Sequence, residues 1–213
     1  MPSNGAQRPG AVNGSPPGPR GDCQLTAAES LSSYIKVYDD DLDADICQKM
    51  IDSFESMAHL HQHNGRGHRE GLELSGWTEL NVGRIADPSF TAFFQRKIQA
   101  ALYRYNRDVQ LTLAVPFAAK TAELTIKRYR PGGEDGFQVH FDSIYDYSNR
   151  FLVLLWYLND VSEGGATRFP DLGVEVAPRT GRLLVFPPYW MFQHAGLPPV
   201  SNAKYIISTY LLF

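Results

Sequence analysis

The amino-acid sequence predicts an α+β fold, a jelly-roll core buttressed by N-terminal helices, and two observations lead to this prediction. In the first half of the chain, apolar residues recur at the three- and four-residue spacing of helices. After Leu113 the chain breaks into short segments rich in β-branched and aromatic residues, separated by Gly and Pro. Short strands at regular intervals are typical of sandwiches and jelly rolls. Helices that precede such strands are expected to cover the outside of the β core.

Two helices are expected before the strands. The first covers residues 42–60, where apolar residues follow a helical period and Asp43 or Asp45 can act as the N-cap. The second covers residues 88–105, because Asp87 suits the N-cap and Pro88 suits the first turn. Strands are expected at residues 121–129, 135–141, 150–159, 173–177, 181–187 and 204–213.

Composition indicates one folded domain with a short extension. Of the 213 residues, 43% are hydrophobic and 20% charged, as in water-soluble globular proteins. Residues 1–24 are mostly polar or small, so we expect a disordered tail there and the folded domain at 25–213. The formal net charge of −3 predicts neither a nucleic-acid partner nor a membrane partner. Two cysteines and the lack of a signal-peptide core favour a cytoplasmic location.

Three residues in the second half have the pattern of a metal site. His140 and Asp142 end an expected strand, and alternate residues of a strand face the same side, so an imidazole and a carboxylate can point at one ion. His194 in a later segment is the third candidate. Two histidines and one carboxylate hold one face of Fe(II) and leave room for a bidentate 2-oxo acid and dioxygen. A His-x-Asp tripeptide by itself is weak evidence, because any strand can carry one.

Lys204 is the first residue of the last expected strand, and this position suggests an anion site. A lysine at the mouth of a barrel is costly to bury unless an anionic group meets it. The distal carboxylate of 2-oxoglutarate would be such a group. The alternative is a lysine whose ammonium group extends to water at the strand end.

A connected series of residues runs through 121–213: Tyr129-Arg130-Pro131-Gly132-Gly133, Phe137, His140-Phe141-Asp142, Arg150, Tyr157-Leu158, Gly164-Gly165-Ala166-Thr167, Phe169, Pro178, Gly181, Phe186, His194-Ala195-Gly196, Val200 and Lys204-Tyr205. In its residues and in their order, this series resembles the prolyl 4-hydroxylase-like branch of the Fe(II)/2-oxoglutarate-dependent dioxygenase superfamily. The resemblance implies a double-stranded β-helix whose open mouth holds the iron.

The resemblance also implies roles for single residues. It implies that His140, Asp142 and His194 are the iron ligands. Lys204 matches the residue that binds the distal carboxylate of the co-substrate, and Tyr129 matches its hydrogen-bonding companion. The implied reactants beside Fe(II) are 2-oxoglutarate and O2, with ascorbate as a further candidate cofactor.

The reaction implied is hydroxylation of an unactivated C–H bond, and the substrate is the open part of the hypothesis. Arg150 matches an arginine that lines the substrate groove, which favours a prolyl residue in a peptide or protein. Two departures, Ala166 in place of an acidic residue and Tyr210 in place of a common tryptophan, keep a free amino acid or small metabolite as an alternative. A non-catalytic jelly-roll binding module is the third candidate. The intact carboxylate Asp142 argues against halogenation, which needs a vacant ligand position.

Residues 61–86 and the segment after Asp142 could flank the site. His59, His61, His63 and His68 match no zinc motif, so a surface loop is favoured over a second metal site. The same segment could act as a mobile lid in which Trp77 contacts the substrate. Tyr145, Asp146 and Tyr147 could line the opposite side, or these aromatic side chains could simply pack at a strand end.

Overall fold

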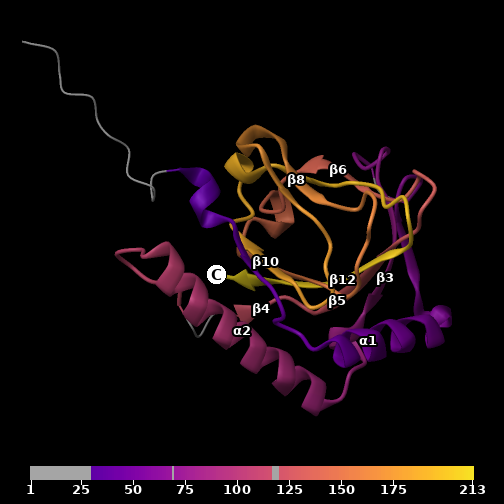
Figure 1. Ribbon diagram of the computed structural model, residues 1–213, viewed down its shortest axis with the longest axis horizontal. Coiled ribbons are helices and arrows are strands. Elements are labelled where there is room, and N and C mark those ends of the chain that lie inside the picture. Colours follow the sequence, from indigo (N-terminus) through magenta and orange to yellow (C-terminus); the bar gives the residue numbers. More distant parts are fainter. Residues whose placement is uncertain (1–29, 69, 117–119) are drawn as a thin grey trace, which may run out of the picture.

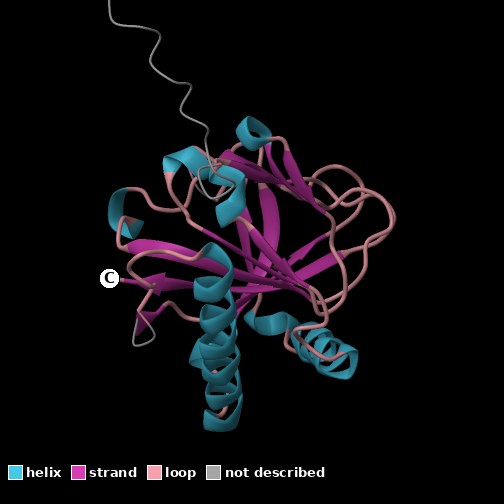
Figure 2. Ribbon diagram, turned by 60° about the vertical axis from the view of Figure 1, so that its left-hand side comes forward, coloured by secondary structure: helices cyan, strands magenta, loops and turns pink. Residues whose placement is uncertain are grey.

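The computed structural model describes residues 30–68, 70–116 and 120–213, and these form a β-barrel-like core with two helices beneath it (Figure 1). The tail expected at 1–24 lies outside the described residues. In Figure 2 both helices lie on one side of the strands, and none covers the opposite side to a similar extent. The α+β prediction, with helices buttressing a jelly roll, is confirmed.

Two antiparallel sheets make the core. The larger sheet has eight strands in the order β1-β10-β7-β12-β5-β3-β2, with β4 beside β12, and the smaller sheet has four in the order β6-β11-β8-β9. The strands are β1 (Lys36–Tyr38), β2 (Gln62–Gly65), β3 (Gly76–Asn81), β4 (Lys120–Thr121), β5 (Thr125–Tyr129), β6 (Phe137–His140), β7 (Arg150–Tyr157), β8 (Thr167–Phe169), β9 (Val174–Val176), β10 (Leu183–Phe186), β11 (His194–Gly196) and β12 (Lys204–Leu212).

The helices are α1 (Ala44–Ser56) and α2 (Pro88–Val109). At the start of α2, the Asp87 side chain accepts hydrogen bonds from the backbone N–H groups of Ser89 and Phe90, which confirms the expected N-cap. Asp43 occupies the N-cap position of α1, but its side chain makes no capping hydrogen bond. No helix among the described residues has both the length and the apolar character needed to cross a membrane.

The larger sheet separates two apolar clusters, because side chains alternate between its faces. On the outer face, Ile126 and Ile207 are buried in a cluster that includes residues of α1 and α2. On the inner face, Tyr129 and Ile206 are buried together with Phe169 of the smaller sheet. The inner cluster therefore forms the wall of the barrel, and the outer cluster fixes the helices to its back.

A buried carboxylate links the segment before α1 to α2 and to the sheet. Asp41 is 7% exposed, and its Oδ2 accepts a hydrogen bond of 2.7 Å from Nε1 of the fully buried Trp156 on β7. Its Oδ1 accepts a hydrogen bond from the guanidinium of Arg104 on α2. A buried charge is tolerated when it is paired and hydrogen-bonded. This one carboxylate thus ties three parts of the fold together.

Gly181 permits the close approach that places Asp41. Its φ of +75° is in the left-handed region, and its carbonyl accepts hydrogen bonds from the backbone N–H groups of Asp41 and Leu42 at 2.9 and 3.1 Å. A Cβ atom at this position would clash with the carbonyl oxygen of Leu42. Glycine is required here for both reasons.

Residues 61–86 differ from the expected loop or lid. They contain β2 and β3, which extend the larger sheet beyond β5 through pairs such as Asn64 with Trp77 and Leu80 with Ile126. The four residues of β2 are Gln, His, Asn and Gly, so the strand carries no apolar alternation that a sequence pattern could detect. Pairing with β3, rather than side-chain burial, holds β2 in the sheet.

We predict that Asp41→Ala lowers the free energy of unfolding by about 3 kcal/mol, because Trp156 Nε1 and Arg104 would lose their buried acceptor. Chemical denaturation of the purified variant measures this change. The control is Glu175→Ala, which removes an exposed ion pair with Arg168 at 2.8 Å and should cost under about 1 kcal/mol. Equal effects of the two substitutions would show that the Asp41 network does not carry the stability assigned to it.

Candidate metal centre

The register of two short strands brings the two candidate histidines together. His194 on β11 is the cross-strand partner of His140 on β6, and their ring centroids lie 4.3 Å apart. Asp142 follows β6, and its backbone N–H donates to the carbonyl of Pro188 at 3.0 Å. This bond fixes the chain after β6 against the segment that leads into β11. The strand pairing and this one loop contact therefore assemble all three residues.

The three side chains converge on a single point. The possible ligand atoms of His140, Asp142 and His194 all lie within 4.8 Å of one another, and this is the one such group among the described residues. Nε2 of His140 is 3.6 Å from Oδ1 of Asp142, and Nε2 of His194 is 3.4 Å from Oδ2. Ligand atoms about 2.1 Å from one ion and at right angles to each other are about 3.0 Å apart. The observed separations fit a single ion after small side-chain movements.

Both imidazoles are already oriented to offer Nε2. Nδ1 of His140 lies 2.8 Å from the carbonyl oxygen of Gln138, and Nδ1 of His194 lies 3.1 Å from that of Phe192. A carbonyl oxygen only accepts, so each Nδ1 carries the proton and each Nε2 keeps its lone pair for a metal. Metal-binding histidines are commonly held in this way by a second partner.

The charge states also suit a metal. Burial, together with the neighbouring His140, lowers the pKa of His194 to about 4, so at neutral pH this imidazole is uncharged. Burial opposes ionisation of Asp142, but its contacts with His140 and His194 hold the pKa of Asp142 below its ordinary value. A neutral imidazole and an ionised carboxylate are the forms that bind a cation.

The cluster opens into a small cavity on the inner face of the barrel. Its walls come from β5, β6, β7, β8, β10, β11 and β12, and its lining residues are Lys127, Tyr129, Phe137, His140, Asp142, Val153, Leu155, Thr167, Phe186, His194, Gly196, Lys204, Ile206, Ser208 and Tyr210. Lys204 and Tyr129, which the sequence assigned to the co-substrate, thus share one cavity with the metal cluster.

Lys204 is buried without an acidic partner in the described part of the chain. It is 2% exposed, and its Nζ lies 5.3 Å from the ring centroid of Tyr129 and 5.5 Å from that of Tyr157. Burial lowers the pKa of Lys204 to about 7. The Tyr157 hydroxyl donates to Oγ1 of Thr167 at 2.7 Å, which leaves a polar wall beside the ammonium group. This pocket fits a carboxylate that enters from outside the chain.

Three residues were predicted to contact the substrate, and they lie in three different environments. Tyr145 is 85% exposed in a turn (Tyr145–Tyr147) just after Asp142, and substrate contact there stays a prediction. Trp77 is 5% exposed and stacks on Phe137 at 4.7 Å, so it lies behind the cavity wall rather than in a lid. Arg150 begins β7, with its guanidinium 3.8 Å from the ring centroid of Tyr210.

Ser208 and Tyr210 were not assigned to the site from the sequence, although a usable signal was present. Both lie on β12 an even number of residues after Lys204, so the period of two places them on the same face. The alternation past Lys204 predicts their presence in the cavity. Thr167 is harder to find, because its strand β8 has only three residues.

The histidine-rich segment forms no second metal cluster in the described part of the chain. His61 Nε2 donates to the carbonyl of Phe54 at 2.8 Å, and His63 Nδ1 lies 3.2 Å from Oγ1 of Thr78. These two histidines have hydrogen-bond partners of their own.

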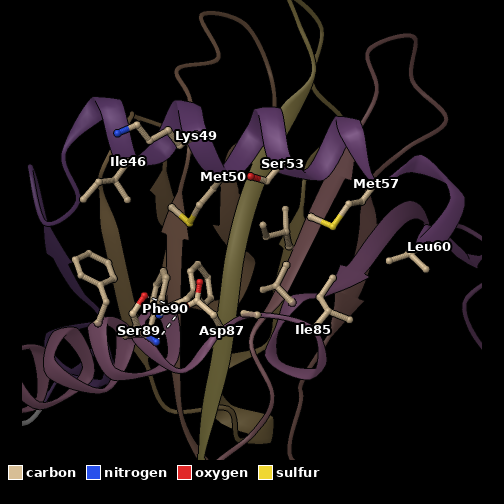
Figure 3. Close-up of a pocket in the computed structure, with 15 residues that line it drawn as sticks. Ile46, Lys49, Met50, Ser53, Met57, Leu60, Ile85, Asp87, Ser89 and Phe90 are labelled. Carbon is tan, nitrogen blue, oxygen red and sulfur yellow. Dashed lines mark hydrogen bonds between the residues drawn. The ribbon is translucent and has the colours of Figure 1, made fainter.

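A separate hollow of about 650 Å³ lies on the outer face between α1 and the start of α2 (Figure 3). Met50, Met57 and Phe90 are among the apolar side chains around it, and its charged lining residues are Lys49 and Asp87. It contains one carboxylate, already used to cap α2, and no histidine or cysteine. The hollow therefore lacks the metal-binding donor set that lines the smaller cavity inside the barrel.

Comparison with known proteins agrees with this geometry. Residues 124–212 match the model of the 2OG-Fe(II) oxygenase superfamily. The chain is 31% identical over 105 residues to the prolyl 4-hydroxylase subunit alpha-2 of Gallus gallus, covering 41% of this chain and 19% of that protein. It is 33% identical over 111 residues to a putative prolyl 4-hydroxylase of Acanthamoeba polyphaga mimivirus, covering 43% and 45%. The chain thus spans less than half the length of these two relatives.

The fold is shared with solved prolyl hydroxylases. A prolyl hydroxylase from Trichoplax adhaerens, solved with a hypoxia inducible factor peptide fragment, superposes with a TM-score of 0.65 at 14% identity, covering 85% of this chain and 84% of that one. The likeness confirms the double-stranded β-helix. Residues 124–212, which match the 2OG-Fe(II) oxygenase superfamily, contain both the metal cluster and the buried Lys204, so this part of the chain is similar to that superfamily and to prolyl 4-hydroxylases.

Proposed function

We propose that this protein is an Fe(II)- and 2-oxoglutarate-dependent hydroxylase that acts on a prolyl residue of a peptide or protein. The observation that carries the proposal is the convergence of His140, Asp142 and His194 beside the buried Lys204, which has no acidic partner among the described residues. A metal triad and an anion pocket in one cavity are the two features that this chemistry requires.

Each residue has a defined task in the proposed reaction. His140, Asp142 and His194 would hold Fe(II) through two Nε2 atoms and a carboxylate oxygen. Bound iron and 2-oxoglutarate would supply hydroxylation of a C–H bond by O2, in which one oxygen atom enters the C–OH product, the other enters succinate, and carbon dioxide leaves. Lys204 would pair with the distal carboxylate of the co-substrate, a charge-assisted contact. Tyr129, its cross-strand partner, would orient that carboxylate.

The protein's further task is to exclude water and to place the substrate. Phe186 and Ile206 line the cavity next to the polar groups, which keeps its interior poorly hydrated. Because a reactive oxidant attacks the nearest C–H bond, the position of the substrate decides which carbon is hydroxylated. The side chains at the mouth therefore determine the product.

Exposed aromatic residues near the mouth favour a peptide substrate over a free metabolite. Tyr145 is 85% exposed and Trp190 is 66% exposed. They lie on neighbouring loops, since the N–H groups of both Asp142 and Ser143 donate to the carbonyl of Pro188. Aromatic side chains on a surface suit proline-containing segments. A prolyl hydroxylase among the similar structures was solved with a peptide, which supports the same class of substrate.

The first prediction concerns the metal. Anaerobic titration of the protein with Fe(II) and 2-oxoglutarate should produce the weak visible charge-transfer band of the chelate, and Asp142→Ala should abolish it, because one of three ligands is lost. The control is Asp146→Ala, which removes an exposed carboxylate from the same loop and should keep the band. A folded wild-type protein without the band would leave a binding module as the better account.

The second prediction concerns Lys204. Lys204→Met should weaken 2-oxoglutarate binding about 10- to 100-fold, which corresponds to a charge-assisted contact of about 1.5–3 kcal/mol. Lys49→Met, which removes an exposed lysine from α1, should leave the affinity unchanged. Calorimetric titration of the metal-loaded protein measures both values.

The same lysine predicts a dependence on pH. Its pKa is lowered to about 7 by burial, and only the charged form pairs with a carboxylate, so the affinity should be full below pH 7 and fall as the pH rises. The fall should approach tenfold for each pH unit above 7. Lys204→Arg should remove this dependence, because a guanidinium stays protonated. An affinity that is constant from pH 6.5 to 8.5 in the wild type would contradict the lowered pKa.

The third test addresses the substrate class. Succinate release should rise when proline-containing peptides are added, and a hydroxylated prolyl residue should appear in the peptide by mass spectrometry. If free amino acids stimulate turnover and peptides do not, the metabolite alternative replaces the peptide one.

A further inference from the structure

A tyrosine of β12 holds the carboxylate of the candidate metal centre. The Tyr210 hydroxyl donates to Oδ1 of Asp142 at 3.0 Å. Tyr210 lies on the inner face of β12, three alternations beyond Lys204, and pairs with Val153 of β7. The hydroxyl therefore reaches Asp142 from the opposite sheet, across the cavity from the strand that leads to this aspartate.

This contact matters because a carboxylate is free to rotate. The last torsion of an aspartate has a broad energy minimum, so its oxygen positions depend on external partners. Oδ1 of Asp142 faces Nε2 of His140 at 3.6 Å, and Oδ2 faces Nε2 of His194 at 3.4 Å. A hydroxyl donor on Oδ1 fixes the carboxylate plane in this orientation before any metal arrives.

The ring of Tyr210 packs against the guanidinium of Arg150. The guanidinium carbon of Arg150 lies 3.8 Å from the ring centroid of Tyr210 and 4.1 Å from that of Tyr147. A guanidinium within about 4 Å of two aromatic ring centroids makes favourable cation–π contacts, and these contacts restrict all three side chains. Arg150 and Tyr147 come from the segment that follows Asp142, so the loop leaving the metal site folds back onto the tyrosine that holds it.

We infer that Tyr210 is a positioning residue for the metal-binding carboxylate, and that Arg150 acts on the site through Tyr210. This inference rests on the metal site of the proposed function. It gives Arg150 a different task from the substrate contact expected from the sequence, because its guanidinium packs against the rings of Tyr147 and Tyr210. Partners that orient metal ligands typically contribute 10- to 100-fold to metal affinity.

The chain offers a closely matched control on the same strand. Tyr205 also belongs to β12, and its hydroxyl also donates to a carboxylate, Oε1 of Glu55, at 2.8 Å. Tyr205 faces α1 on the outer side of the sheet, whereas Tyr210 faces the cavity. Tyr210→Phe and Tyr205→Phe therefore remove the same group and the same kind of hydrogen bond, at the site and away from it.

The experiment measures Co(II) binding by calorimetry without oxygen and without 2-oxoglutarate, so that it does not depend on turnover. Tyr210→Phe should raise the dissociation constant about tenfold or more, and Tyr205→Phe should change it less than twofold. Thermal unfolding of the metal-free variants verifies that each is folded. If Tyr210→Phe does not fold, Tyr210→Met is the second variant, because a flexible thioether fills the space without a hydroxyl.

A double-mutant cycle tests the part played by Arg150. If Arg150 acts through Tyr210, removing the tyrosine hydroxyl should weaken Co(II) binding less in an Arg150→Met background than in the wild-type background. This comparison cancels the direct repulsion between the arginine and the metal, since that repulsion is absent from both members of the mutant pair. Equal losses in the two backgrounds would overturn the role given to Arg150.

The possible results distinguish a failure of the proposed metal site from a failure of the role given to Tyr210. A wild-type protein that binds no Co(II) overturns the proposed metal site and this inference together. A wild-type protein that binds Co(II), with Tyr210→Phe and Tyr205→Phe both unchanged, overturns the inference alone and leaves the proposed function standing. Loss confined to Tyr210→Phe supports both.

Discussion

The pairing of β12 between β7 and β5 is the constraint on which the rest of the structure depends. Because its side chains alternate, one face of this strand carries Ile207 and Leu211 into the core beneath the helices, and the other carries Lys204 and Tyr210 into the cavity. A shift of the register by one residue would exchange the two faces, exposing the apolar set to the cavity and driving the lysine into the helix-packed core. Stability and the chemistry of the site are thus set by the same pairing, and the apolar residues protect the register that the polar residues need.

The metal centre lies on two strands that are much shorter than β12. The strands β6 and β11 are short, with four and three residues, and their register shifts between His194 and Gly196. Hydrogen bonds outside the ladder compensate for the short pairing. Each imidazole is held by a carbonyl two residues before it, and the Pro188 carbonyl fixes the backbone of Asp142. These contacts are local in sequence or lie in neighbouring loops, so they orient the ligands even where the sheet itself is minimal.

The sequence predicted the parts of the fold that follow a strong pattern. The two helices and the long strands β7 and β12 carry clear apolar periods, and the resemblance of residues 121–213 to a known family identified His140, Asp142 and His194 as the metal cluster. It missed β2, whose residues have no apolar alternation, and β8 and β11, whose three residues are too few to show a period. Trp77 was assigned to a lid for the same reason, since nothing in its neighbourhood signals a strand. The stack of Arg150 on Tyr210 could not be predicted either, because it depends on where a turn places two distant side chains.

The two buried charges Asp41 and Lys204 differ in whether the protein itself supplies an oppositely charged partner. Asp41 is buried with Trp156 and Arg104 as partners, so its desolvation is offset and it needs no ligand. Lys204 is as well buried, but it has no acidic partner among the described residues, and the desolvation of its ammonium group lowers its pKa. A fold that had to optimise stability alone would replace this lysine with an apolar residue. Its position in the cavity of the metal triad is explained when an anionic co-substrate pairs with it, because the ammonium charge that is costly to bury alone then selects the ligand.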